Sequence, residues 1–234
     1  MKGGVSMCRP SIARCCMVTR KGSYNRRHVV ETWQRNLRLV LRHIRFFRPW
    51  DPVNKARVAA LEDLFRGVNR FLRDLEIDYW LVFGTLLGYH REGGIISFDY
   101  DIDFGAHERD YQKILKHRGT LPHGFRMYDT SHRHPGPKLY IAYKGWEADI
   151  YFYEERDATL QCLLNSDVQG DKRPFPESYV YPLRETTFLG EKTFIPNQVE
   201  PYLVHMYGYI GRDAWQDRKT GYWHPRDRRE DAVD

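Results

Sequence analysis

Residues 98–104 have the sequence Phe98-Asp99-Tyr100-Asp101-Ile102-Asp103-Phe104, in which apolar or aromatic residues alternate with aspartates. Side chains alternate between the two faces of a strand, so Asp99, Asp101 and Asp103 would share one face and the apolar residues the other. Aspartate is disfavoured in strands, and three like charges on one face repel one another. The pattern therefore predicts a strand over about residues 95–104, anchored by its apolar face, whose acidic face binds a divalent cation.

Two other structures are compatible with part of this pattern. A solvated strand face is the ordinary alternative for alternating residues, although three successive aspartates make it a poor explanation. An EF-hand loop would place Asp99, Asp101 and Asp103 at its first three ligand positions. Phe104 then occupies the position that requires glycine, which excludes this loop.

A candidate phosphate-binding segment precedes the aspartates. The apolar run from Ile77 to Phe83 has the length of a buried strand, and Gly84 and Thr85 end it where a short helix is expected to begin. A glycine lets a phosphate approach the backbone, and a helix N-terminus offers free N–H groups. Gly-Thr is also an ordinary helix start, but its place before the aspartates predicts that Gly84 and Thr85 bind a donor phosphate.

Together these segments resemble the signature of the LicD/fukutin family, which belongs to the nucleotidyltransferase-fold superfamily. The resemblance runs without gaps from Gly84 to Asp103 and extends over about residues 56–215. Its matching positions are Gly84-Thr85-Leu86-Leu87-Gly88, Arg91, Gly94, Ile96, Asp99-Tyr100-Asp101-Ile102-Asp103, and the later Pro182-Leu183, Phe188, Gly190, Pro196, Tyr202-Leu203 and Tyr207-Gly208.

The resemblance implies a phosphotransferase that uses a CDP-activated donor. Family members are associated with moving phosphocholine or an alditol phosphate from that donor onto a glycan or a lipid-linked glycan. Ser97 and Phe98 stand where the family usually has Pro-Trp, and Tyr100 stands where many members have aspartate. These departures affect the packing around the metal strand more than its ligands, and they weaken any inference about which donor is used.

The resemblance also implies a third carboxylate from a later strand, and the matching residue is Asp149. A buried carboxylate needs a cation, a metal or a helix terminus beside it. Glu147 lies on the same strand face and is the alternative ligand. We expect Asp101, Asp103 and Asp149 to be the catalytic ligands of Mg²⁺, with Mn²⁺ as an alternative metal, and Asp99 or Asp149 to act as general base.

Two basic residues are weaker candidates for contacts with the donor. Arg91 matches the family and would hold a donor phosphate, or else form a structural ion pair. Lys138 begins a strand next to the expected site, and lysine is a common point charge for phosphate. A solvated strand end is its ordinary alternative.

The rest of the chain alternates helical and strand patterns. Helices are predicted over about residues 54–75, 108–116 and 198–206. Hairpins are predicted for 138–143 with 146–152, around Lys144-Gly145, and for 186–188 with 192–195. This order predicts an α/β (α+β) fold, with a nucleotidyltransferase-like mixed sheet flanked by helices, over residues 51–234.

The first fifty residues differ from this domain in charge. Residues 1–50 carry twelve Lys/Arg against one Glu, a net charge of +11, whereas the remaining residues carry 25 Lys/Arg against 30 Asp/Glu, a net charge of −5. An amphipathic helix is predicted over 30–47, after a flexible segment. It would dock on the domain or make peripheral contact with an anionic membrane surface.

The composition excludes several other classes of protein. No run approaches the roughly 20 apolar residues of a membrane-spanning helix, and the N-terminal segment lacks the apolar core of a secretory signal. Four cysteines are too few for a disulfide framework. We therefore expect a cytoplasmic protein that does not bind nucleic acid. A nucleotidyltransferase that releases pyrophosphate is the first alternative function, and a non-enzymatic membrane or nucleic-acid adaptor the second.

Overall fold

The computed structural model describes residues 52–164 and 166–228. The basic arm of residues 1–50, with the helix predicted over 30–47, lies outside these residues, so the arm and the domain boundary at residue 51 stay predictions. No helix within the described residues is both long and apolar enough to cross a membrane.

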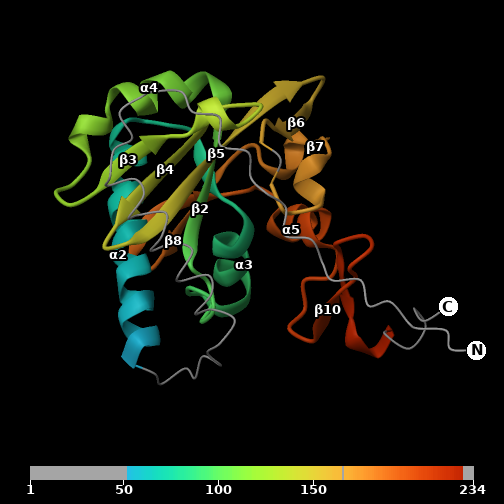
Figure 1. Cartoon of the computed structure of the whole chain (residues 1–234). Coiled ribbons are helices and arrows are strands. Elements are labelled where there is room, and N and C mark those ends of the chain that lie inside the picture. Colours follow the sequence, from blue (N-terminus) through green and yellow to red (C-terminus); the bar gives the residue numbers. More distant parts are fainter. Residues whose placement is uncertain (1–51, 165, 229–234) are drawn as a thin grey trace, which may run out of the picture. The chain divides into compact units, whose positions relative to one another are not determined.

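The centre of the fold is a seven-stranded mixed sheet, in which β2, β5, β4 and β3 lie side by side (Figure 1). The order along the main path is β1-β2-β5-β4-β3, and β6 and β7 continue from the far end of β5. β2 and β5 pair in parallel, and the other neighbours pair antiparallel. The strands are β1 (Tyr79–Leu81), β2 (Asp101–His107), β3 (Arg126–Asp129), β4 (Lys138–Tyr143), β5 (Trp146–Arg156), β6 (Thr159–Cys162) and β7 (Phe175–Pro176). The predicted mixed α/β architecture is confirmed.

One face of the sheet is covered by α2 (Pro52–Asp74), which contacts β2, β4 and β5. Phe65 of α2 stacks on Phe104 of β2, with ring centroids 6.0 Å apart. Phe104 and Ile150 are buried on this face, so burial of apolar side chains under α2 stabilises the central strands. Because side chains alternate, the aspartates of β2 must face the other way.

The opposite face is bordered by α3 (Phe83–Glu92), which contacts β2 and also α5 (Val199–Tyr207). The short helix α4 (Tyr111–Lys116) follows β2 at the predicted place and packs Tyr111 on Phe152, which shares the α2 side of the sheet with Ile150, with ring centroids 5.4 Å apart. Two small antiparallel pairs complete the described residues: β8 (Arg184–Phe188) with β9 (Glu191–Ile195), and β10 (Ala214–Gln216) with β11 (Trp223–Pro225).

The hairpin of β4 and β5 forms as predicted. Tyr143 pairs with Trp146, which leaves Lys144 and Gly145 as a two-residue turn. Both turn residues have positive φ, 47° and 82°, as the tight turns that match the right-handed twist of a hairpin require. This turn sets the register that brings Lys138 of β4 next to the acidic residues of β5.

The prediction of a strand over residues 95–104 was wrong at both ends. β2 begins at Asp101 and continues to His107, so Asp99 precedes the strand and does not share a strand face with Asp101 and Asp103. Phe98, expected in the core, is 62% exposed, whereas Ile102 and Phe104 are buried as predicted. The run predicted as a strand to Phe83 ends at Leu81, because Phe83 takes a φ of 46° and begins α3.

Candidate metal centre

Three carboxylates converge on the face of the sheet opposite to α2. Asp103 of β2 lies directly opposite Asp149 of β5 in the parallel pairing, and Asp101 lies two residues before Asp103 on the same face. One ligand atom from each of these three residues lies within 4.8 Å of the others. Glu147, the alternative ligand, pairs with Asp101 in the register but is not part of this group. Three hard carboxylate oxygens at this spacing suit Mg²⁺ or Mn²⁺.

Asp103 is the most deeply placed member of the group, with only 6% of its surface exposed. Burial raises its pKa well above the usual value, and the negative charges of Asp101 and Asp149 raise it further. The backbone N–H of Asp103 donates a 2.9 Å hydrogen bond to Oγ1 of Thr85, so the first turn of α3 holds this part of β2. Without a cation, the site concentrates negative charge where water is scarce.

Lys138 supplies positive charge at the edge of the group. Its Nζ lies 3.3 Å from Oδ2 of Asp149, and both side chains are largely shielded, at 17% and 16% exposure. Nζ also lies 4.8 Å from the ring centroid of Tyr151, whose hydroxyl donates to Asp149 at 3.4 Å. Sequence reasoning missed Tyr151, although its position two residues after Asp149 on a strand is a usable signal.

Gly84, which was predicted to bind a donor phosphate together with Thr85, lies next to the carboxylate of Asp99. A Cβ added to Gly84 would meet Oδ2 of Asp99 at 2.7 Å, so the carboxylate of Asp99 lies against the first turn of α3. A negative charge is favourable at that end of a helix. Thr85 is buried, and its oxygen accepts from Asp103. The role of Gly84 and Thr85 toward a phosphate stays a prediction.

Two further groups border the carboxylates. Tyr207 ends α5, and burial raises its pKa, with the charges of Asp103 and Asp99 adding to the effect. His134 is largely exposed in the loop before β4, within the electrostatic influence of Asp149. Partial burial lowers its pKa, and the positive charge of Lys138 lowers it further.

The family of this domain follows from comparison with known proteins. Residues 76–198, which contain the three aspartates, match the family described as LicD/FKTN/FKRP, nucleotidyltransferase domain. The chain belongs to the LicD/FKTN/FKRP family.

Curated relatives of this LicD-family chain include proteins named as transferases. It is 30% identical over 159 residues to the ribitol-5-phosphate transferase FKTN of Mus musculus, which covers 63% of this chain and 32% of the relative. It is 27% identical to the ribitol 5-phosphate transferase FKRP of Homo sapiens, over 64% of this chain and 31% of the relative. An uncharacterized protein of Rickettsia typhi is 31% identical, over 58% of this chain and 41% of the relative. The chain thus spans 31–41% of the length of these relatives.

Among solved structures, the LicD-family domain resembles a lincomycin-bound lincosamide antibiotic adenylyltransferase, LnuA. The likeness covers 68% of this chain and 90% of that chain, with 15% sequence identity and a TM-score of 0.40.

Arg57 is a buried residue that sequence reasoning missed. It lies in α2, before the residues that match the LicD family, and is only 2% exposed. Its guanidinium donates to the backbone carbonyl oxygens of Ser97 and Asp99, on either side of Phe98. The guanidinium therefore fixes the path of the chain into β2. The sequence gives one indication that Arg57 is buried. It lies four positions before Leu61, and therefore on the apolar stripe of the helix.

Arg91, which was predicted with Gly84, Thr85 and Lys138 to bind the donor, contacts the segment after α5. Its Nε donates to the carbonyl of Ile210 at 2.6 Å and its Nη2 to the carbonyl of Gly211 at 2.7 Å. These contacts hold the C-terminal segment against α3. A contact of Arg91 with donor phosphate stays a prediction.

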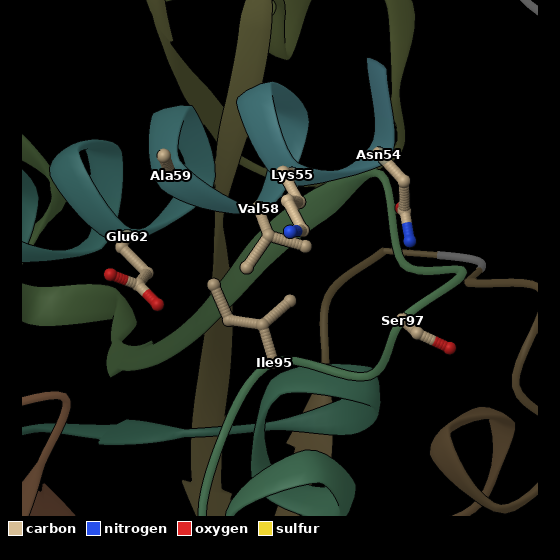
Figure 2. A pocket seen from close by; sticks show the side chains of 7 residues that line it. All are labelled: Asn54, Lys55, Val58, Ala59, Glu62, Ile95 and Ser97. Carbon is tan, nitrogen blue, oxygen red and sulfur yellow. The ribbon is translucent and has the colours of Figure 1, made fainter. Parts of the chain in front are cut away.

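A groove of about 310 Å³ lies beside the segment that Arg57 holds. It runs between the first turns of α2 and residues 95–97, and Figure 2 shows Val58 and Ile95 facing each other across it. Lys55 and Glu62 are the charged residues of its lining. The groove borders the chain that enters β2, and the three converging carboxylates are not part of its lining.

Proposed function

We propose that this chain is a metal-dependent phosphotransferase that moves a phosphorylated alcohol from a CDP-activated donor to a glycan hydroxyl. Family membership supports the reaction class, since relatives in this family are named as ribitol-5-phosphate transferases. The transferred group would be an alditol phosphate or phosphocholine. The observation that carries the proposal is the convergence of Asp101, Asp103 and Asp149.

The chemistry of these residues fits a resident divalent cation. The group has one buried and two half-buried carboxylates, and Lys138 is ion-paired to Asp149 at its edge. Burying carboxylate charges next to one another is costly, and a bound divalent cation would lower that cost. Asp101, Asp103 and Asp149 would therefore hold Mg²⁺ or Mn²⁺. The ion would supply charge neutralisation at the donor diphosphate.

The reaction needs one bond made and one broken at the same phosphorus. The acceptor oxygen forms a bond to the phosphorus that bears the alcohol, the bond from that phosphorus to CMP breaks, and CMP leaves with the electron pair. The hydroxyl proton passes to a base, for which Asp99 and Asp149 are the candidates. Lys138 would pair with a donor phosphate oxygen, since it already lies at the edge of the carboxylate group.

The leaving group tests the proposal. The full-length protein is incubated with Mg²⁺ or Mn²⁺, a panel of glycan acceptors, and CDP-ribitol, CDP-choline or each nucleoside triphosphate, and released CMP and pyrophosphate are quantified. CMP release that depends on the metal and is lost in Asp103→Asn supports the proposal. Metal-dependent pyrophosphate release without CMP would show a nucleotidyltransferase, the second candidate, which the description of the matched domain favours. No turnover of any donor, with a metal-binding wild type, would contradict both.

A further inference from the structure

The carboxylate group is one end of a row of side chains that crosses four strands. Asp103 pairs with Asp149, Asp149 with Tyr140, and Tyr140 with Tyr128 in the registers of β2, β5, β4 and β3. Directly opposed residues in neighbouring strands point to the same face of a sheet. Two acidic positions and two tyrosines therefore lie in line on one face, and the strands that carry them are adjacent in Figure 1.

The two tyrosines form a stacked aromatic pair. The rings of Tyr128 and Tyr140 stack with centroids 4.8 Å apart and an angle of 13° between their planes. Both side chains are half-buried, and they lie on the face opposite to the one that α2 covers. Neighbouring strands are about 4.8 Å apart, so the Cα atoms of Tyr140 and Tyr128 lie roughly 5 and 10 Å from that of Asp149. The stacked pair therefore begins at the edge of the acidic group, and a planar group can extend the stack.

The positive charge of Lys138 lies next to the tyrosine pair. Lys138 precedes Tyr140 by two residues on β4 and shares its face, and its Nζ is 3.3 Å from Asp149. The same strand thus offers a cation for phosphate and a ring for a planar group. In a nucleotide, one ribose separates the phosphates from the base. The phosphates would lie at Lys138 and the base at the tyrosine pair.

We infer that Tyr140 and Tyr128 form the subsite for the base of the nucleotide donor. The base stacks on the tyrosine pair while its phosphates lie at Lys138 and the three aspartates. Stacking accepts every base, because each has a π face, so this subsite supplies affinity for a nucleotide and little discrimination among bases. The inference rests on the proposed use of a nucleotide donor and adds the residues that hold its base.

The test is calorimetric titration of the full-length protein with CMP, UMP, AMP and GMP in the presence of Mg²⁺ or Mn²⁺. Tyr140→Ala should weaken CMP binding roughly 5- to 150-fold, the range expected for loss of one aromatic–base stack. Tyr140→Phe, which keeps the ring, should bind as the wild type does. Ribose 5-phosphate, which lacks a base, should bind weakly and with an affinity that Tyr140→Ala leaves unchanged.

The chain provides a matched control on the same strand. Tyr143 stacks on Phe125 with centroids 4.2 Å apart and an angle of 15°, but its alternation along β4 places it on the opposite face. Tyr143→Ala therefore removes a similar ring pair away from the carboxylates and should leave CMP affinity unchanged. Equal losses in the two alanine variants would overturn the inference, because they would reflect a general disturbance of β4.

The remaining outcomes separate this inference from the proposed function. If the wild type binds CMP and Tyr140→Ala binds it equally well, the base subsite is wrong while the donor class stands. The same holds if Tyr140→Ala raises only the KM for a glycan acceptor, which would make the tyrosines an acceptor surface. If the wild type binds none of the four nucleotides although metal raises its Tm, the nucleotide donor itself is wrong.

Discussion

The side-chain oxygen of Thr85 accepts a 2.9 Å hydrogen bond from the backbone N–H of Asp103, and both residues are buried. This contact joins the start of α3 to the deepest of the three carboxylate residues. It satisfies a backbone donor of β2 that lies out of reach of bulk water. Thr85 therefore has a structural task whether or not its hydroxyl proton also contacts a donor phosphate.

Replacing Thr85 by valine should destabilise the protein by roughly 1–3 kcal/mol, because the isosteric side chain leaves the N–H of Asp103 without an acceptor. Urea denaturation monitored by tryptophan fluorescence measures this change. Thr85→Ser keeps the oxygen and should recover most of the loss. A valine variant as stable as the wild type would mean that the hydrogen bond to the N–H of Asp103 does not matter.

Asp103→Asn should stabilise the metal-free protein and abolish its response to metal. The pKa of Asp103 is raised in the folded state, so folding favours the protonated acid. This favourable contribution is complete below the unfolded pKa of about 3.9 and is lost as pH rises through the higher folded pKa. At neutral pH the charged side chain thus costs stability unless a cation is bound.

Thermal unfolding of the Asp103 variant with EDTA, Mg²⁺ or Mn²⁺ provides the measurement. Each kcal/mol relieved corresponds to about 2–4 °C in Tm for a protein of this size. We expect a higher Tm in EDTA than for the wild type, and no further rise on adding metal. A metal-dependent rise that persists in Asp103→Asn would place the ion elsewhere.

Arg57→Met should loosen the chain that enters β2. The substitution leaves the carbonyl oxygens of Ser97 and Asp99 without their buried donor. We expect a loss of roughly 2–4 kcal/mol in the free energy of unfolding, from the loss of charge-assisted hydrogen bonds of a buried guanidinium, and a lower kcat from a less well placed Asp99. Arg70→Met is the control: Arg70 lies on the same helix, but its side chain is 64% exposed and pairs with Glu191 at the surface. It should change neither quantity, and similar effects of both variants would contradict a specific role for Arg57.

Lys138→Met should weaken nucleotide binding about tenfold or more, since a charge-assisted contact to phosphate is lost. Metal binding should not weaken, because Lys138 competes with the ion for Asp149. Titration with CMP and the rise in Tm caused by Mg²⁺ measure the two effects separately. Lys144→Met, in the turn of the same hairpin, removes an exposed lysine that pairs with Asp63 and should affect neither. Loss of metal binding in Lys138→Met would show that the lysine supports the carboxylates instead.

Periodicity predicted most elements of this fold, because their local patterns and their packing agree. The apolar stripe of the helix over 54–75 faces the sheet in α2, and Lys144-Gly145 forms the expected turn between β4 and β5. Asp101 and Asp103 were correctly placed on one strand face, and the structure brings Asp149 to them. The family resemblance guided the choice of Asp149 over Glu147, since strand alternation alone places both on the same face.

The position of Asp99 could not be predicted from alternation. The regular pattern continues through residue 99, but the carbonyls of Ser97 and Asp99 bond to Arg57 and not to a neighbouring strand. A strand ends where its partner ends, and the partner depends on the fold as a whole. The row from Asp103 to Tyr128 depends on four strand registers at once, which no local pattern contains.

The acidic group forms only when β2 and β5 pair in one particular register. A shift of one residue between these strands would turn Asp149 to the covered face and put Ala148 or Ile150 beside Asp103. An ion that needs all three carboxylates binds only the correct alignment, and so favours it by mass action. During folding, such an ion would stabilise only chains in which β2 and β5 pair in the native register. Misaligned forms would not gain this stabilisation.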